Sequence, residues 1–307
     1  MNGRGRLAGA SVLAALLTAP WLAGQTAAPP QGPSAFRAAA DAVSVDVSVQ
    51  RDRRPVPDLK PSDFAVLDNG VPQEITDVTY ERLPIDVTLL LDVSASVTGT
   101  VLDELRRALR QVRADLRPGD RLRLITFNMR VQRVVDFGDA ASDVDQALPA
   151  LTAGGSSAVL DGLAVALTTP ELPGRRRLIV LFSDGQDSSS ITEADTLLDV
   201  VRRSASTVAF ILGSLSSDRP ASLLRTTSAT VGGFANRVAE ETGGVVTSVT
   251  RGESLPSQFR RMLQDFRASY VLYFTPQGVD RSGAHTLDVR VNRPGVTVRA
   301  RRGYIWR

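Results

Sequence analysis

The chain has 307 residues, of which 43% are hydrophobic and 22% charged, and its formal net charge is +3. This length suits one α/β domain of about 180 residues with smaller flanking pieces. The absence of cysteine and the single histidine, His285, exclude disulfides, thiolate chemistry and a multi-histidine zinc site. Lys60 is the only lysine, so a Walker A phosphate loop is excluded as well.

The basic residues do not indicate a nucleic-acid-binding protein. The sequence pI is about 9.8, but 36 basic residues face 33 acidic ones. The chain contains neither an aromatic-basic platform nor a single strong basic stripe. We therefore expect no nucleic-acid partner.

The N-terminus is typical of an export signal. Arg4 and Arg6 precede an apolar stretch from Leu7 to Leu22, and small residues follow. We interpret residues 1–26 as a signal peptide, with an uncleaved signal anchor as the alternative. We expect an exported protein, periplasmic or secreted, with no transmembrane span in the mature chain. Residues 27–40 form a linker rich in Pro, Ala and Gly.

Residues 41–83 predict a small β module. Val43–Val49 alternates branched apolar with small polar residues, as a half-buried strand does. Two further strands are predicted at Asp63–Leu67 and Gln73–Tyr80, around the turn signal Asp68-Asn69-Gly70. A module of about 40 residues is too small to fold alone.

Residues 84–268 predict a doubly wound, mostly parallel α/β sheet. Ile85–Leu91 and Arg177–Phe182 are nearly continuous apolar runs, as expected of parallel strands buried on both faces. Further strands are expected at 121–127, 131–135, 208–212 and 245–248, and helices at 101–116, 158–167, 191–203, 229–241 and 254–266. This alternation of strand and helix defines the fold class.

Residues 269–307 return to a β pattern. Strands are predicted at 269–274, 285–291 and 296–299. We expect this tail to pack with the N-terminal β module, which would place a small flanking sheet beside the α/β domain.

Oxygen-bearing side chains follow the two buried strands. Asp92, Ser94 and Ser96 come directly after the first, and Ser183-Asp184-Gly185 ends the second. In open α/β sheets, ligands bind at the carboxyl ends of the strands. The loop Gly154–Ser157 supplies further hydroxyls before a helix. Ligands that are all oxygen suit a hard cation such as Mg²⁺, Ca²⁺ or Mn²⁺.

This set of motifs resembles the metal-ion-dependent adhesion site of von Willebrand factor A (VWA) domains. The resemblance covers about residues 86–267 and includes the order and spacing of the three motifs. The flanks Asp63–Gln73 and Val298–Tyr304 are similar to those of secreted bacterial VWFA-related proteins that are common in acidobacteria.

The resemblance implies a ligand set. Ser94, Ser96 and a loop hydroxyl would contact the metal, with Asp92 and Asp184 holding it directly or through water. The family usually has threonine in the loop, in a Thr-Ala-Leu-Tyr-Asp context. The segment Ser157–Asp161 aligns best with that context, so Ser157 is the expected loop ligand, and the adjacent Ser156 is the alternative register.

Two further acids, Asp161 and Asp187, lie close to these motifs in the sequence. We place Asp161 in the helix that follows the loop, away from the metal. Asp187 is expected in solvent or in the outer sphere of the site. Mg²⁺ is the first expectation for the cation, with Ca²⁺ and Mn²⁺ as alternatives.

The implied function is binding and not catalysis. Neutral hydroxyl ligands do not offset the positive charge of a cation. An acidic residue of a protein partner would therefore complete its coordination. A VWA protein that acts in structure or assembly without metal is the alternative, and a metal-dependent hydrolase is a third possibility.

Enzyme alternatives lack residues that they need. A dehalogenase-like phosphatase would carry a second acid where Ser94 stands, and its downstream lysine is missing. A serine hydrolase needs a base near its serine, and His285 lies in the predicted β tail. The arginine clusters 175–177 and 299–302 are expected to be solvated or edge-protecting charges.

Overall fold

The computed structural model describes residues 42–139, 141–168, 170, 172–214, 231–250 and 253–306. The segments interpreted as a signal peptide, 1–26, and as a linker, 27–40, lie outside the described residues. None of the helices in the described ranges is long and apolar enough to cross a membrane.

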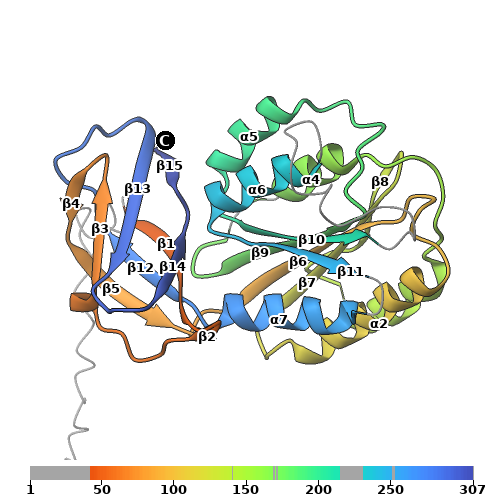
Figure 1. Ribbon diagram of the computed structural model, residues 1–307, viewed down its shortest axis with the longest axis horizontal. Coiled ribbons are helices and arrows are strands. Elements are labelled where there is room, and N and C mark those ends of the chain that lie inside the picture. The colour runs from red at the N-terminus through yellow and green to blue at the C-terminus, as the bar shows by residue number, and fades with distance from the viewer. Residues whose placement is uncertain are drawn as a thin grey trace, which may run out of the picture. The chain divides into compact units, whose positions relative to one another are not determined.

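A six-stranded sheet forms the centre of the α/β domain (Figure 1). Its strand order is β11-β10-β9-β6-β7-β8, and all neighbours are parallel except the β7–β8 pair. The strands are β6 (Ile85–Asp92), β7 (Arg121–Phe127), β8 (Val131–Val135), β9 (Arg176–Ser183), β10 (Thr207–Ser214) and β11 (Val246–Thr250). The predicted fold class is confirmed.

Helices cover both faces of this sheet (Figure 1). One face carries α4 (Val159–Leu167), α5 (Ala194–Arg203) and α6 (Val231–Thr242), and the other carries α2 (Thr100–Asp115) and α7 (Leu255–Arg267). The short helices α3 (Ala141–Ala147) and η2 (Leu148–Ala150) follow β8. Neither was predicted from the sequence, because neither is long enough to show a clear helical period.

One helix begins later than expected, and the start of another lies outside the described residues. The helix expected from Ile191 begins only at Ala194, since the residues before it form a loop. The helix expected from Ala229 is described from Val231 onward, because 215–230 lie outside the described residues. Such shifts of a few residues are the usual uncertainty of helix ends.

The buried strands separate two cores. Every residue of β6 and of β9 is buried. Because side chains alternate along a strand, Leu89 and Leu91 pack toward α2 and α7, whereas Leu90 packs toward α4 and α5. The central strands therefore hold both helical layers in place.

The flanking β module consists of two small sheets. The first has the order β14-β1-β12-β5, with β2 beside β1, and the second has the order β15-β13-β3-β4. The first comprises β14 (Thr297–Ala300), β1 (Val43–Arg51), β12 (Tyr270–Phe274), β5 (Ile75–Tyr80) and β2 (Arg54–Pro55); the second comprises β15 (Gly303–Trp306), β13 (Gly283–Val291), β3 (Phe64–Asp68) and β4 (Val71–Gln73). The short helix η1 (Pro61–Asp63) precedes β3.

The N-terminal and C-terminal segments interleave in this module. C-terminal β12 lies between N-terminal β1 and β5, with antiparallel pairing to both. Val45, Val47 and Val49 of β1 share a core with Tyr270 and Leu272 of β12. The single strand expected at 73–80 is two strands, β4 and β5, and β15 was not expected.

The one histidine is part of a buried polar cluster in this module. His285 Nδ1 lies 2.8 Å from Asp68 Oδ1, and the Tyr304 hydroxyl donates to Asp68 Oδ2 at 2.6 Å. His285 is 3% exposed and its ring stacks on that of Tyr304. The cluster joins β3, β13 and β15.

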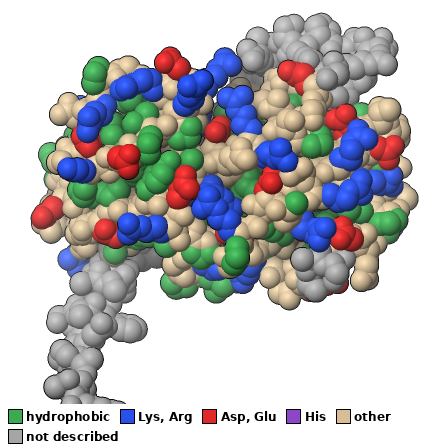
Figure 2. Space-filling model, turned by 90° about the horizontal axis from the view of Figure 1, so that it is seen from below, with side chains coloured by type: hydrophobic (Ala, Val, Ile, Leu, Met, Phe, Trp, Pro, Cys, Tyr) green, Lys and Arg blue, Asp and Glu red, His purple; other side chains and the backbone are tan. Residues whose placement is uncertain are grey.

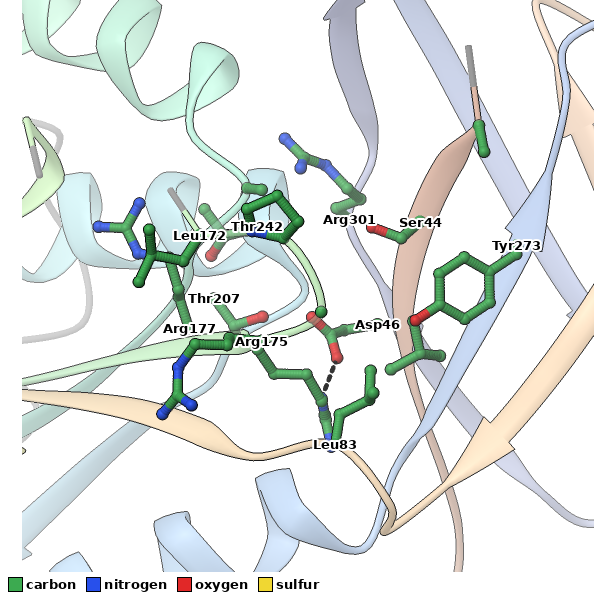
Figure 3. Close-up of a pocket in the computed structure, with 16 residues that line it drawn as sticks. Ser44, Asp46, Leu83, Leu172, Arg175, Arg177, Thr207, Thr242, Tyr273 and Arg301 are labelled. Carbon is green, nitrogen blue, oxygen red and sulfur yellow. Dashed lines mark hydrogen bonds and ion pairs between the residues drawn. The ribbon is translucent and has the colours of Figure 1, made fainter. Parts of the chain in front are cut away.

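Arg176 ties the β module to the α/β domain. Its guanidinium donates to Asp46 of β1 at 2.6 Å and to the Phe266 carbonyl of α7 at 2.8 Å. Figure 3 shows Asp46 of this ion pair, at a cavity of about 490 Å³ lined by residues of both parts of the chain. Arg176 and Arg177 are 4% and 5% exposed and lie on β9, which is inside the sheet. The expectation that the cluster 175–177 consists of solvated or edge-protecting charges was therefore wrong for these two arginines.

Charges of both signs alternate on the surface. Figure 2 shows arginines interspersed with acidic side chains on the face seen from below. On the helices, Arg260 pairs with Asp115 and Arg261 with Asp265. This face therefore carries no continuous basic stripe.

The Arg176–Asp46 pair predicts a measurable effect on stability. Replacing Asp46 with Asn leaves a buried guanidinium without its carboxylate, so we expect the free energy of unfolding to fall by about 1–3 kcal/mol. Asp288→Asn is the control, because its pair with Arg290 is largely exposed and should contribute little. Urea unfolding of both variants is the measurement; equal effects would contradict the structural role of Asp46.

Candidate metal centre

The candidate site lies where the strand order reverses. The chain leaves β6 toward β7 on one side, and β9 lies on the other side. Asp92 is the last residue of β6 and Ser183 the last of β9. Open α/β sheets bind ligands at this switch point, outside the carboxyl ends of the strands.

Asp92 is the centre of a hydrogen-bond network. Its Oδ1 accepts the Ser94 backbone N–H at 2.8 Å, a turn typical of Asp. Its Oδ2 accepts the hydroxyls of Ser157 at 3.0 Å and of Ser183 at 2.8 Å. Asp92 is 0% exposed, so its carboxylate is held by protein groups alone and its orientation is fixed.

Ser94 and Ser96 present their hydroxyls together. The two Oγ atoms lie 3.1 Å apart. Ser94 is 4% exposed, whereas Ser96 is exposed to solvent. The site is therefore closed at Asp92 and open at Ser96.

The loop that carries Ser157 is fastened to the loop after β6. The Ala95 N–H donates to the Gly155 carbonyl at 2.9 Å, and the Gly154 N–H donates to the Val93 carbonyl at 2.9 Å. Gly155 has a φ of +80°, a conformation that glycine adopts without strain. Ser157 is the loop serine that bonds to Asp92.

The loop after β9 supplies the second carboxylate. Asp184 Oδ1 accepts the Gln186 N–H at 3.1 Å, and Gly185 has a φ of +87°. The backbone N–H groups of Ser188 and Ser189 donate to the Ser157 carbonyl. This loop is therefore tied to the same centre.

The two further acids of this region support the loop after β9. Asp161 accepts the N–H groups of Ile191 and Thr192, at 3.0 and 2.8 Å to its nearer oxygens. Burial raises the pKa of Asp161, but these hydrogen bonds lower it by more, so the pKa lies below its usual value. Asp187 accepts the Leu160 N–H at 3.3 Å, at the start of α4.

Sequence analysis assigned no role to Ser183. Its hydroxyl donates to Asp92 and accepts the Gly185 N–H at 3.1 Å, so it positions both loops. A small polar residue at the end of an otherwise apolar strand was the available signal. Asn128, which holds the Gly154 carbonyl at 2.8 Å, gave no signal in the sequence.

The electrostatics of the centre favour a cation. Burial raises the pKa of Asp92, and the negative charge of Asp184 raises it further, against the lowering effect of bonds from Ser94 and Ser183. Among the described residues, no ion pair involves Asp92. A bound cation would compensate this desolvated charge.

The donor set fits a hard divalent cation. Hydroxyl and carboxylate oxygens are the ligands that Mg²⁺ and Ca²⁺ prefer. Within the described ranges, no cluster of three or more His, Cys, Asp or Glu residues is suited to a metal. The donors gathered at this centre are thus mainly serine hydroxyls.

Residues 87–186 match the family model for the von Willebrand factor type A domain. The chain therefore contains a VWA domain, as the motifs predicted. VWA domains often mediate metal-dependent protein interactions. The match includes Asp92, Ser94, Ser96, Ser157 and Asp184.

The chain is similar to parts of much longer proteins. It is 25% identical over 144 residues to inter-alpha-trypsin inhibitor heavy chain H1 from Sus scrofa, which is 43% of this chain and 15% of that protein. It is 25% identical over 206 residues to heavy chain H6 from Homo sapiens, 61% of this chain and 15% of that protein. The chain thus spans about a seventh of the length of these relatives.

Solved structures show distant likenesses. A von Willebrand factor type A protein from Catenulispora acidiphila has a TM-score of 0.48 and 13% identity, covering 85% of this chain and 74% of that one. Proximal thread matrix protein 1 from the mussel byssus has a TM-score of 0.47 and 15% identity, covering 64% of this chain and 48% of that one. In that structure the metal-ion-dependent adhesion site (MIDAS) motif is occupied by zinc.

The raised pKa of Asp92 predicts a pH-dependent stability. An unfolded Asp ionises near pH 4, whereas folded Asp92 holds its proton to higher pH. In a chelator, the free energy of unfolding should therefore fall as pH rises through this window and then level off. Asp92→Asn carries no charge to bury at this position. As pH rises through the same window, the free energy of unfolding of this variant should therefore increase relative to that of the wild type. Urea unfolding from pH 4 to 8 is the measurement; a parallel pH dependence in both proteins would contradict a desolvated Asp92.

Proposed function

We propose that this VWA domain mediates divalent-metal-dependent protein–protein interaction or adhesion outside the cytoplasm. The observation that carries the proposal is the arrangement around Asp92. A fully buried carboxylate lies at the switch point of the sheet, bonded to serine hydroxyls, with an exposed serine at its mouth. A site that is closed on the protein side and open on the solvent side suits a ligand that arrives from another molecule.

Each residue of the centre has a proposed role. Ser94, Ser96 and Ser157 would hold the metal through their hydroxyls, and Asp92 and Asp184 would hold it directly or through water. Mg²⁺ is the proposed cation, with Ca²⁺ or Mn²⁺ able to replace it. When bound, the metal supplies a positive charge to which a carboxylate oxygen can bind.

The proposed partner is a protein that presents an acidic residue. Three of the five proposed ligands are neutral hydroxyls, so they add no negative charge to offset the positive charge of the cation. Ser96 is exposed, which leaves room for a partner's Asp or Glu beside it. The metal would thus join two proteins through oxygen ligands from both.

A binding role is supported further by the placement of potential bases. His285, the only histidine, is buried against Asp68 and Tyr304 in the β module. Lys60 lies in the same module, before η1. Neither is positioned at the carboxyl ends of β6 and β9, and we propose that the protein is not an enzyme.

The proposed location rests on the leader sequence. Residues 1–26 combine two arginines, an apolar stretch and small residues, as export signals do. We propose that the protein functions in the periplasm or is secreted.

Metal titration of the protein tests the metal claim. Isothermal calorimetry should show Mg²⁺ binding to the wild type. Ser96→Ala should weaken it about tenfold or more, because a ligand oxygen is lost at an exposed position that does not affect packing. Thr98→Ala is the matched control, since Thr98 is an exposed hydroxyl two residues further along, and its affinity should equal that of the wild type.

Two outcomes of this titration decide against the proposal. If none of Mg²⁺, Ca²⁺ and Mn²⁺ binds, the domain has a structural or assembly role without metal. If metal binds and Ser96→Ala behaves like Thr98→Ala, the metal lies elsewhere. Pull-down from envelope extracts with and without chelator then tests whether a protein partner depends on the metal.

A further inference from the structure

A cavity of about 420 Å³ opens beside the metal centre. One wall is the hairpin of β7 and β8, including Met129, Arg130 and Val134, and the opposite wall includes Ala150 and Leu151 at the end of η2. Its volume falls within the range of pockets that bind small ligands or single side chains. We call it the hairpin pocket.

The hairpin pocket shares residues with the metal centre. Val93 lines the pocket and stands in the chain between Asp92 and Ser94. Asn128 also lines it, and its amide holds the carbonyl of Gly154 in the loop that carries Ser157. The pocket and the metal centre therefore border on the same two stretches of chain, the loop after β6 and the loop that carries Ser157.

The mouth of the pocket exposes a large apolar side chain. Met129 is 63% exposed, and a Cβ atom built on Gly155 would lie 3.4 Å from its sulfur. Methionine adapts its shape to different partners and is common at binding surfaces. Met129 therefore lies exposed beside the loop that carries Ser157.

The charge of the pocket has one sign. Among the residues that the structure describes, Arg130 is the only charged one that lines it. Arg130 is exposed, and its side chain has no ion pair within the part of the chain that the structure describes. An approaching acidic group is attracted here, and a basic one is repelled.

These observations point to one kind of occupant. We propose that the partner is a protein segment that carries, within a few residues of the acid offered to the metal, an apolar side chain that enters the hairpin pocket and a second acid that pairs with Arg130. This inference rests on the proposed function, because it assigns the specificity of the same metal-dependent contact. The metal would bind only segments that carry an acidic residue. Among these segments, the pocket would favour those with a suitably placed apolar side chain.

The test uses a random peptide library displayed on phage and selected on the full protein in Mg²⁺. Selected peptides should share an acidic residue with a bulky apolar residue at a fixed spacing. The strongest peptide is then synthesised, and its affinity is measured by fluorescence anisotropy. Replacing its acidic residue with Asn, or adding chelator, should abolish binding.

Two variants address the pocket without touching the metal ligands. Ala150→Phe fills the pocket from an exposed position, and Arg130→Glu reverses its charge. Each should weaken the peptide about tenfold or more, as the loss of a central contact does, while the affinity for Mg²⁺ stays unchanged. The matched controls are Ala114→Phe and Arg110→Glu, at exposed positions of α2, which should bind the peptide as the wild type does.

The outcomes separate this inference from the proposed function. Mg²⁺-dependent peptides that bind both pocket variants as well as the controls would overturn the inference and leave the function standing. Selected peptides without a shared apolar residue, or no Mg²⁺-dependent peptide from a protein that binds Mg²⁺, would also overturn it. Failure of the wild type to bind any divalent metal would overturn the function itself.

Discussion

The structure of the site depends on the burial of one carboxylate. Asp92 is removed from water at the end of the central strand, and its oxygens accept two serine hydroxyls and one backbone N–H. Burying a charge without an ionic partner costs free energy, and these hydrogen bonds offset only part of that cost, as the raised pKa of Asp92 indicates. The same bonds fix three loops around one point. A cation that binds there gains a prepared set of oxygens and relieves the remaining cost.

Strand β9 connects this site to the rest of the molecule. Its middle is apolar and buried on both faces, but each end is polar. Arg176 at one end bonds to Asp46 of the β module and to the last turn of α7. Ser183 at the other end bonds to Asp92. One buried strand therefore runs between the joint with the β module and the metal centre, and both helical layers pack on it.

Much of the fold was predictable, because the central strands are long, apolar runs and the helices between them are amphipathic. The short α3 and η2 were missed, since a few residues show no period, and they form a wall of the hairpin pocket. At the candidate site, the placement of Asp92 and Asp184 after strand ends could be predicted from the sequence, whereas the choice of Ser157 rested on the resemblance to VWA domains. Ser183 and Asn128 were not predicted, because they act through hydrogen bonds between loops distant in sequence. Arg175 and Arg176 were misjudged, since their partners Asp86 and Asp46 lie 89 and 130 residues away in the chain, contacts that no local pattern reveals.

The central claim is that a divalent cation binds between the loops that surround Asp92. Crystals of the protein grown with Mn²⁺, measured at the manganese absorption edge, locate such an ion directly. The account predicts one strong anomalous peak between the hydroxyls of Ser94, Ser96 and Ser157, which is lost in crystals of Asp92→Asn. Crystals with no peak at this position, or with a peak that persists in the variant, would contradict it.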